Sequence, residues 1–157
     1  MCLMHGLVEG QGCLDLTAIT KRYGRWLETN PVDVGYTTKQ ALQYADPKKP
    51  DPQKVMQAAM THCSTSESNG SLMRATPMAV WSHKLPQQQA IFAIHSDVKF
   101  THSLPSVANI VEAYVMAIRY LLNNPADPDR NNNAFLVAMA SANANACELT
   151  IKYLMDA

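Results

Sequence analysis

Apolar residues recur at helical spacing through most of the chain. The clearest pattern covers Val107–Leu122, where apolar side chains fall at positions i, i+3, i+4 and i+7 and predict a long amphipathic helix. Pro105 suits the first turn of this helix, and Ser103 is a candidate N-cap. A last helix is predicted over residues 134–155. No run of four or more residues alternates convincingly like a strand. The pattern therefore predicts an all-α fold, a compact bundle of several helices.

Shorter apolar stretches predict further helices earlier in the chain, and capping or helix-breaking residues suggest their limits. The first is Cys2–Glu9, the second is capped by Asp15, carries Leu16 to Leu27 and ends at Asn30-Pro31, and the third is capped by Thr37 or Thr38 and runs through Ala45. A fourth helix carries Val55 to Met60. An apolar stretch from Ser71 to Trp81 follows, which Pro77 should kink or break, and Pro86 then opens a helix that runs through Ile94.

Three short segments depart from this helical pattern, and such departures are where functional residues are expected. The first is the turn formed by residues 30–38, in which Asp33 stands between Val32 and Val34. The flanking residues predict a rigid, partly buried carboxylate beside a pocket. The alternative is that Asp33 accepts backbone N–H groups or caps the following helix. The sequence leaves both interpretations open.

The other two segments are 68–74 and 101–105. In the first, small residues around Gly70 precede a helix, where backbone N–H groups are suited to hold phosphate or ribose oxygens. An ordinary N-cap loop is the alternative. The second segment places His102 beside a helix cap. A single histidine in this position is also common as a hydrogen-bonding surface or core residue.

Charge and composition exclude some functional classes. The 157 residues suit one domain, and the net charge of zero disfavours a nucleic-acid partner. Apolar runs are far too short to span a membrane, so no membrane partner is expected. The four cysteines are scattered and form no C-x-x-C pair, which favours free, mostly buried thiols in a reducing compartment. The start of the chain does not look like a signal peptide, so a cytoplasmic location is expected.

In order and spacing, the three segments resemble the motifs of the ADP-ribosylglycohydrolase family. The matching stretches are Pro31-Val32-Asp33-Val34-Gly35-x-Thr37-Thr38, then Ser68-Asn69-Gly70-Ser71-Leu72-Met73-Arg74-x-x-Pro77, then Thr101-His102-Ser103 ahead of the long helix with Tyr114. The resemblance covers nearly the whole chain. It implies an all-α enzyme that hydrolyses the glycosidic bond between ADP-ribose and a protein side chain or small acceptor. Its partner would be an ADP-ribosylated protein or an ADP-ribose derivative.

The resemblance also assigns roles to residues of this chain. Asp33 matches the family carboxylate near the scissile linkage and is the candidate catalytic residue. Arg74 is interpreted as a structural anchor for the loop rather than as a phosphate ligand. The residues assigned to substrate binding are Gly35 and Thr37 in the turn of Asp33, Asn69, Gly70 and Ser71 with backbone N–H groups towards the diphosphate, Met73 in the same motif, and His102 on the nucleotide side of the cleft.

The metal ligands of the family are missing from this sequence. Family members hold two Mg²⁺ or Mn²⁺ ions through a Thr-Asp-Asp-Thr/Ser motif near the N-terminus and an Asp-x-Asp-Thr motif near the C-terminus. Neither motif is present, since Asp127-x-Asp129 is followed by Arg130 in a loop. No metal ligand is therefore assigned, and residues 1–157 are expected to be a partial domain from the middle of a longer protein. The alternative is a catalytically inactive relative that binds ADP-ribose or serves as a structural module.

Overall fold

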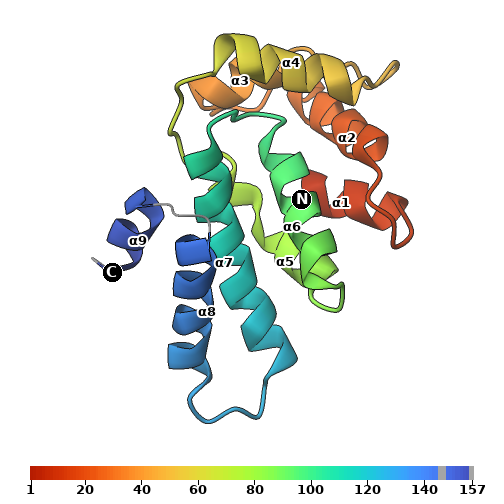
Figure 1. The fold of residues 1–157 in the computed structure, drawn as a ribbon. Coiled ribbons are helices and arrows are strands. Elements are labelled where there is room, and N and C mark those ends of the chain that lie inside the picture. The colour runs from red at the N-terminus through yellow and green to blue at the C-terminus, as the bar shows by residue number, and fades with distance from the viewer. Residues whose placement is uncertain (145–147, 156–157) are drawn as a thin grey trace.

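The computed structural model describes residues 1–144 and 148–155, which form helices and loops without a strand (Figure 1). The predicted all-α class is confirmed. The elements are α1 (Cys2–Glu9), α2 (Leu16–Glu28), α3 (Tyr36–Leu42), α4 (Pro52–His62), the 3₁₀ turn η1 (Leu72–Arg74), α5 (Thr76–Ser82), α6 (Gln87–Val98), α7 (Pro105–Asn123), α8 (Arg130–Ala144) and α9 (Glu148–Met155). None of the described helices is long and apolar enough to cross a bilayer.

Helix α7 is the centre of the fold and packs against α5, α6 and α8, with α8 running back alongside it (Figure 1). Helix α1 packs against α2 and α5, and α3 packs against α4. The core between them includes Ile19, Val55, Phe100 and Val115, each with no exposed surface. Full burial of such a side chain contributes about 1.5–3 kcal/mol, so the apolar faces of the helices hold this arrangement together.

Two helix signals in the sequence are confirmed. Helix α7 covers the predicted amphipathic stretch and begins at Pro105, although Leu104 occupies the N-cap position and the predicted Ser103 cap is not formed. Helix α2 is capped as predicted, because Asp15 Oδ1 accepts hydrogen bonds from the backbone N–H groups of Thr17 and Ala18. Asn30 follows its end with a φ of 50°, a left-handed conformation that asparagine tolerates.

The predicted limits of the third helix are wrong. Neither Thr37 nor Thr38 caps α3, which begins at Tyr36 and ends before Ala45. The hydroxyl of Thr37 instead forms a hydrogen bond with Ser66, so a tertiary contact replaces the local cap. The stretch from Ser71 to Trp81 is broken near Pro77, as predicted, into η1 and α5. Pro77 lies in the first turn of α5, where its missing N–H costs nothing.

The single C-terminal helix predicted over residues 134–155 is also wrong. Helix α8 already begins at Arg130, where the Asp127 and Asp129 side chains accept hydrogen bonds from Asn133 and Asn132. It ends at Ala144, and α9 is a separate helix that contacts both α7 and α8. Apolar spacing detects helical residues but does not show where one helix ends and another takes a new direction.

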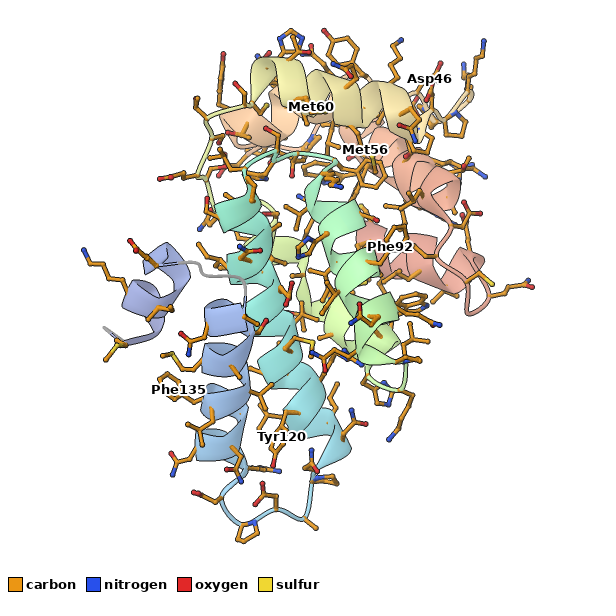
Figure 2. All side chains as sticks on the ribbon, viewed as in Figure 1. Asp46, Met56, Met60, Phe92, Tyr120 and Phe135 are labelled. Carbon is orange, nitrogen blue, oxygen red and sulfur yellow. The ribbon has the colours of Figure 1, made fainter. Side chains whose placement is uncertain are left out.

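Several large apolar side chains remain on the surface of the described chain. Figure 2 shows Met60, Phe92 and Phe135 on the outer faces of α4, α6 and α8, and all three are more than one-third exposed. The thiols also depart from expectation. Cys63 is buried, but Cys2 is partly exposed and Cys13 is exposed, so the thiols with a described environment are not mostly buried. Cys147 lies outside the described residues.

Candidate functional site

A pocket of about 560 Å³ lies where the Asp33 turn, the start of α3, the loop before η1 and the first residues of α1 meet. Most residues that the sequence assigned to the site line this pocket, namely Asp33, Gly35, Thr37, Asn69, Gly70 and Met73. Ser71 and His102 do not line it. Ser71 is completely buried, and its hydroxyl has no hydrogen-bond partner among the described residues.

Contacts between α3 and the loop that follows α4 bring the two predicted motifs together. Thr37 Oγ1 lies 2.7 Å from Ser66 Oγ, and the backbone carbonyl of Thr37 accepts a hydrogen bond from the Cys63 thiol. Gly70 packs so closely on α3 that an added Cβ would lie 2.8 Å from Thr38 Oγ1. A residue without a side chain therefore allows the loop to approach the helix and close one side of the pocket.

Arg74 anchors the same loop to α6, as the sequence predicted. Its Nε donates to Asp97 Oδ2 over 3.0 Å, and its Nη2 donates to the Asp97 carbonyl over 2.8 Å. Its Nη1 donates to the Gly70 carbonyl and to Thr101 Oγ1. Burial on its own would lower the pKa of Arg74, but the Asp97 carboxylate outweighs it and raises that pKa above its usual value. The guanidinium is therefore permanently charged and holds the loop in place, and Arg74 also lines the pocket.

Asp33 differs from its predicted environment, because the structure exposes it. The neighbouring Val32 is fully exposed, so the turn projects from the fold and gives the carboxylate no desolvated site. Asp33 makes no hydrogen bond or ion pair with the described residues, and the position before α3 belongs to Gly35, which lacks a capping side chain. The alternative in which Asp33 caps the helix therefore fails as well. The carboxylate is free at the rim of the pocket.

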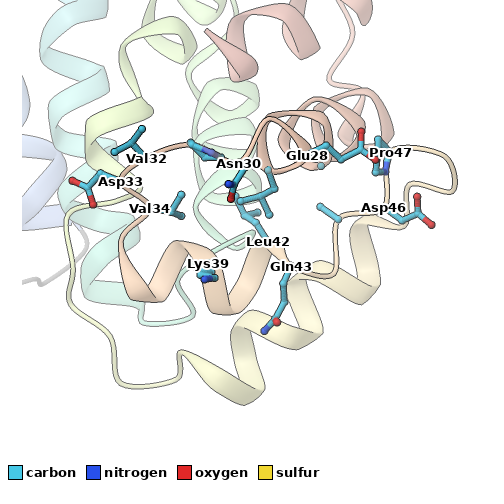
Figure 3. Close-up of a pocket in the computed structure, with 14 residues that line it drawn as sticks. Glu28, Asn30, Val32, Asp33, Val34, Lys39, Leu42, Gln43, Asp46 and Pro47 are labelled. Carbon is cyan, nitrogen blue, oxygen red and sulfur yellow. The ribbon is translucent and has the colours of Figure 1, made fainter.

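A second hollow of about 730 Å³ lies on the other side of this turn (Figure 3). It is bounded by the end of α2, by α3 and by the residues before Pro47. Asp33 stands at its edge, with the carboxylate directed away from Asn30, Val34 and Lys39 (Figure 3). The residues of the other two predicted segments are absent from its lining. The pocket of 560 Å³ is therefore the candidate site.

His102 lies beneath the pocket rather than on its surface and is 1% exposed. Its Nε2 lies 2.9 Å from Ser68 Oγ, and its Nδ1 lies 2.8 Å from Thr101 Oγ1. Ser68 does line the pocket, although it was not among the residues assigned to the site. A serine beside Asn-Gly is typical of any loop, and only its contact with a histidine far along the chain distinguishes it.

The environment of His102 predicts a pH dependence of stability. Burial, and then the positive charge of Arg74, lower the pKa of His102 from about 6.5 to about 4. The unfolded chain therefore binds the extra proton first as the pH falls, so this residue should reduce the free energy of unfolding between about pH 6.5 and pH 4, by up to about 3 kcal/mol. Urea unfolding across this pH range should show a steeper loss for the unchanged chain than for His102→Gln. Equal slopes would contradict the prediction.

The described residues do not fit a two-metal site. No group of three or more His, Cys, Asp or Glu side chains within 1–144 and 148–155 lies close enough together to hold an ion. The Asp127 carboxylate is already used locally, since it accepts hydrogen bonds from the Tyr120 hydroxyl, the Asn133 amide and the Asp129 N–H. No chemical step through a metal is therefore derived from these side chains.

Comparison with known proteins identifies similar sequences. The sequence model of the ADP-ribosylglycohydrolase family matches residues 1–157. A protein of Acanthamoeba polyphaga mimivirus, named as a putative ADP-ribosyl glycohydrolase, is 27% identical over 113 residues. That alignment covers 69% of this chain and 33% of the viral protein, so the chain spans about a third of the length of this relative. No solved structure matches the chain.

Proposed function

Because this chain belongs to the ADP-ribosylglycohydrolase family, we propose that its pocket binds ADP-ribose and that it acts in hydrolysing the bond between ADP-ribose and a protein side chain or small acceptor. The observation that carries the proposal is the meeting of the Asp33 turn and the Asn69–Gly70 loop in one pocket. A volume of about 560 Å³ lies in the range usual for small-molecule sites.

The residues of the pocket suit different parts of such a ligand. Asp33 supplies a free carboxylate at the rim, where it can engage the acceptor or the reacting ribose. Asn69 and Gly70 line the pocket, so the backbone of this loop can reach the oxygens of the ligand. Met73 is 77% exposed and offers an apolar surface that a bound sugar or base would cover. The carboxylate and the loop would thus act on opposite parts of the ligand.

A second candidate function is ADP-ribose binding without catalysis. It is favoured by the lack of a metal-holding cluster among the described residues, because the family resemblance implies two Mg²⁺ or Mn²⁺ ions. The residues of this chain supply binding and positioning in both cases. The two functions therefore differ in turnover and not in affinity.

The test combines binding and turnover. ADP-ribose affinity is measured by calorimetry, and release of ADP-ribose is measured by chromatography from ADP-ribosylated arginine, ADP-ribosylated serine peptide and O-acetyl-ADP-ribose, with Mg²⁺ or Mn²⁺ present. We expect one ADP-ribose per chain and release from at least one substrate. Binding without release from any substrate would support the non-catalytic function. Absence of binding would contradict both functions.

Asp33→Asn should separate the two measurements. We expect the substitution to lower the rate of hydrolysis at least about 100-fold, because it removes the charge that matters as the bond breaks. ADP-ribose affinity should stay within about tenfold, or roughly 1.4 kcal/mol, because shape and one acceptor oxygen remain. Glu28→Gln is the matched control, since Glu28 is exposed and lines only the second hollow. Equal rates in the Asn and Gln variants would contradict a catalytic Asp33.

A further inference from the structure

A line of hydrogen bonds leads from the partly buried Arg74 to Ser68 at the pocket. Arg74 Nη1 donates to Thr101 Oγ1 over 2.9 Å. Thr101 Oγ1 lies 2.8 Å from His102 Nδ1, and the other ring nitrogen, Nε2, lies 2.9 Å from Ser68 Oγ. Thr101 and His102 are buried, whereas Ser68 is exposed and lines the pocket. The line therefore connects a fixed positive charge to a hydroxyl that a ligand can reach.

The direction of these hydrogen bonds follows from counting donors and acceptors. A guanidinium only donates, so Thr101 Oγ1 accepts from Arg74. Thr101 is completely buried, and its own hydroxyl proton needs an acceptor within the protein. The acceptor that the structure provides is His102 Nδ1. That nitrogen therefore carries no hydrogen, and Nε2 carries the single N–H of the neutral ring.

The charge state of His102 agrees with this assignment. Burial, and then the positive charge of Arg74, lower the pKa of His102 to about 4, so the ring is neutral near neutral pH. A neutral ring has one N–H, and the preceding count places it on Nε2. The N–H of Nε2 then donates to Ser68 Oγ. Because Ser68 Oγ accepts this bond, its own O–H is left to donate.

We propose that Ser68 is a substrate-binding residue whose hydroxyl donates to a phosphate oxygen of the ligand, with Thr101 and His102 as positioning residues that hold it in the donor orientation. Among the described residues, the Ser68 hydroxyl forms a hydrogen bond with no side chain other than His102, and Ser68 is exposed and lines the pocket. A phosphate oxygen only accepts, whereas a ribose hydroxyl both donates and accepts. The positive charge of Arg74 polarises the successive hydrogen bonds and makes the Ser68 hydroxyl a stronger donor, which suits an anionic acceptor. The inference rests on the proposed function, because it takes ADP-ribose as the ligand.

The first test determines which ring nitrogen of His102 carries the hydrogen. NMR of the chain labelled with ¹⁵N-histidine distinguishes a protonated ring nitrogen from an unprotonated one, and His102→Gln identifies the signals of this residue among the five histidines. Near neutral pH we expect Nε2 to be protonated and Nδ1 to be unprotonated. The opposite tautomer would place an acceptor against Ser68 and overturn the proposal, whatever the chain binds.

The second test measures ligand affinity by calorimetry with ADP-ribose, ADP and adenosine. Ser68→Ala should lower the affinity for ADP-ribose and ADP at least about tenfold, as expected for loss of a hydrogen bond to a charged group. The affinity for adenosine, which has no phosphate, should not change. Ser68→Thr keeps the hydroxyl and should bind ADP-ribose within about threefold of the unchanged chain. Ser64→Ala is the control, because Ser64 is an exposed serine of the same loop that does not line the pocket.

The outcomes separate this inference from the function on which it rests. If the unchanged chain binds ADP-ribose and Ser68→Ala binds it equally well, the inference fails and the proposed function stands. If Ser68→Ala lowers the affinity for adenosine as much as that for ADP-ribose, the hydroxyl maintains the conformation of the loop and the phosphate assignment is wrong. If the unchanged chain binds neither ADP-ribose nor ADP, both proposals fail.

Discussion

Arg74→Met is expected to reduce the free energy of unfolding by about 3–5 kcal/mol, the usual cost of removing one partner of a buried ion pair. Asp97 is 3% exposed. Without Arg74 its carboxylate would still accept a hydrogen bond from the Tyr23 hydroxyl, but no positive charge would balance it. Thr101 Oγ1 and the Gly70 carbonyl would lose a donor at the same time. Urea unfolding near neutral pH measures the change.

The chain offers a matched control on its surface. Arg22 pairs with Glu9, and both side chains remain about 30% exposed, so solvent screens this pair. Arg22→Met should therefore cost less than about 1 kcal/mol. If both arginine substitutions have similar effects, the buried pair does not stabilise the fold as argued. Arg74→Lys should lie between the two, because lysine keeps the charge but has no planar group to contact Asp97, Thr101 and Gly70 together.

Gly24→Ala is expected to destabilise the chain by about 3 kcal/mol, even though alanine favours a helix by about 1 kcal/mol over glycine. Helix α2 lies very close to the turn that follows α3. A Cβ added to Gly24 would lie 2.1 Å from the Ala45 carbonyl oxygen and 2.9 Å from Pro47 Cδ. A backbone oxygen cannot rotate away, so the helix or the turn must shift. Urea and thermal unfolding measure the loss.

Gly35→Ala is the control for Gly24→Ala, because nothing lies within 4 Å of the added Cβ and the backbone of Gly35 has a negative φ. This substitution should cost less than about 1 kcal/mol, because Gly35 is the N-cap of α3 and alanine is less favourable than glycine there. Equal effects of the two alanines would show that the approach of α2 to Ala45 is not rigid. A large loss confined to Gly24 would confirm that glycine permits this packing.

The candidate site was predicted from the sequence in part, because some of its features are local and others are not. The order of the Asp33 turn and the Asn69–Gly70 loop is a property of the sequence, and both segments line the pocket. Their exposure is not a local property. Two flanking valines predicted a partly buried Asp33, but Val32 packs against nothing and the carboxylate is exposed. Burial depends on which elements pack around a turn, and neighbours in sequence do not determine it.

The sequence by itself determined the helical class, the long amphipathic helix and the Asp15 cap. Each of these depends on contacts within a few residues. The resemblance suggested that Arg74 anchors its loop, but its partners Asp97 and Thr101 lie more than twenty residues away and only the tertiary structure showed them. Only the tertiary structure decided that Thr37 contacts Ser66 instead of capping α3, and that His102 supports Ser68 from below the pocket. The hydroxyls of threonine and serine and the ring of histidine can each donate or accept a hydrogen bond. Their roles therefore depend on the partner that a distant segment brings within hydrogen-bonding distance.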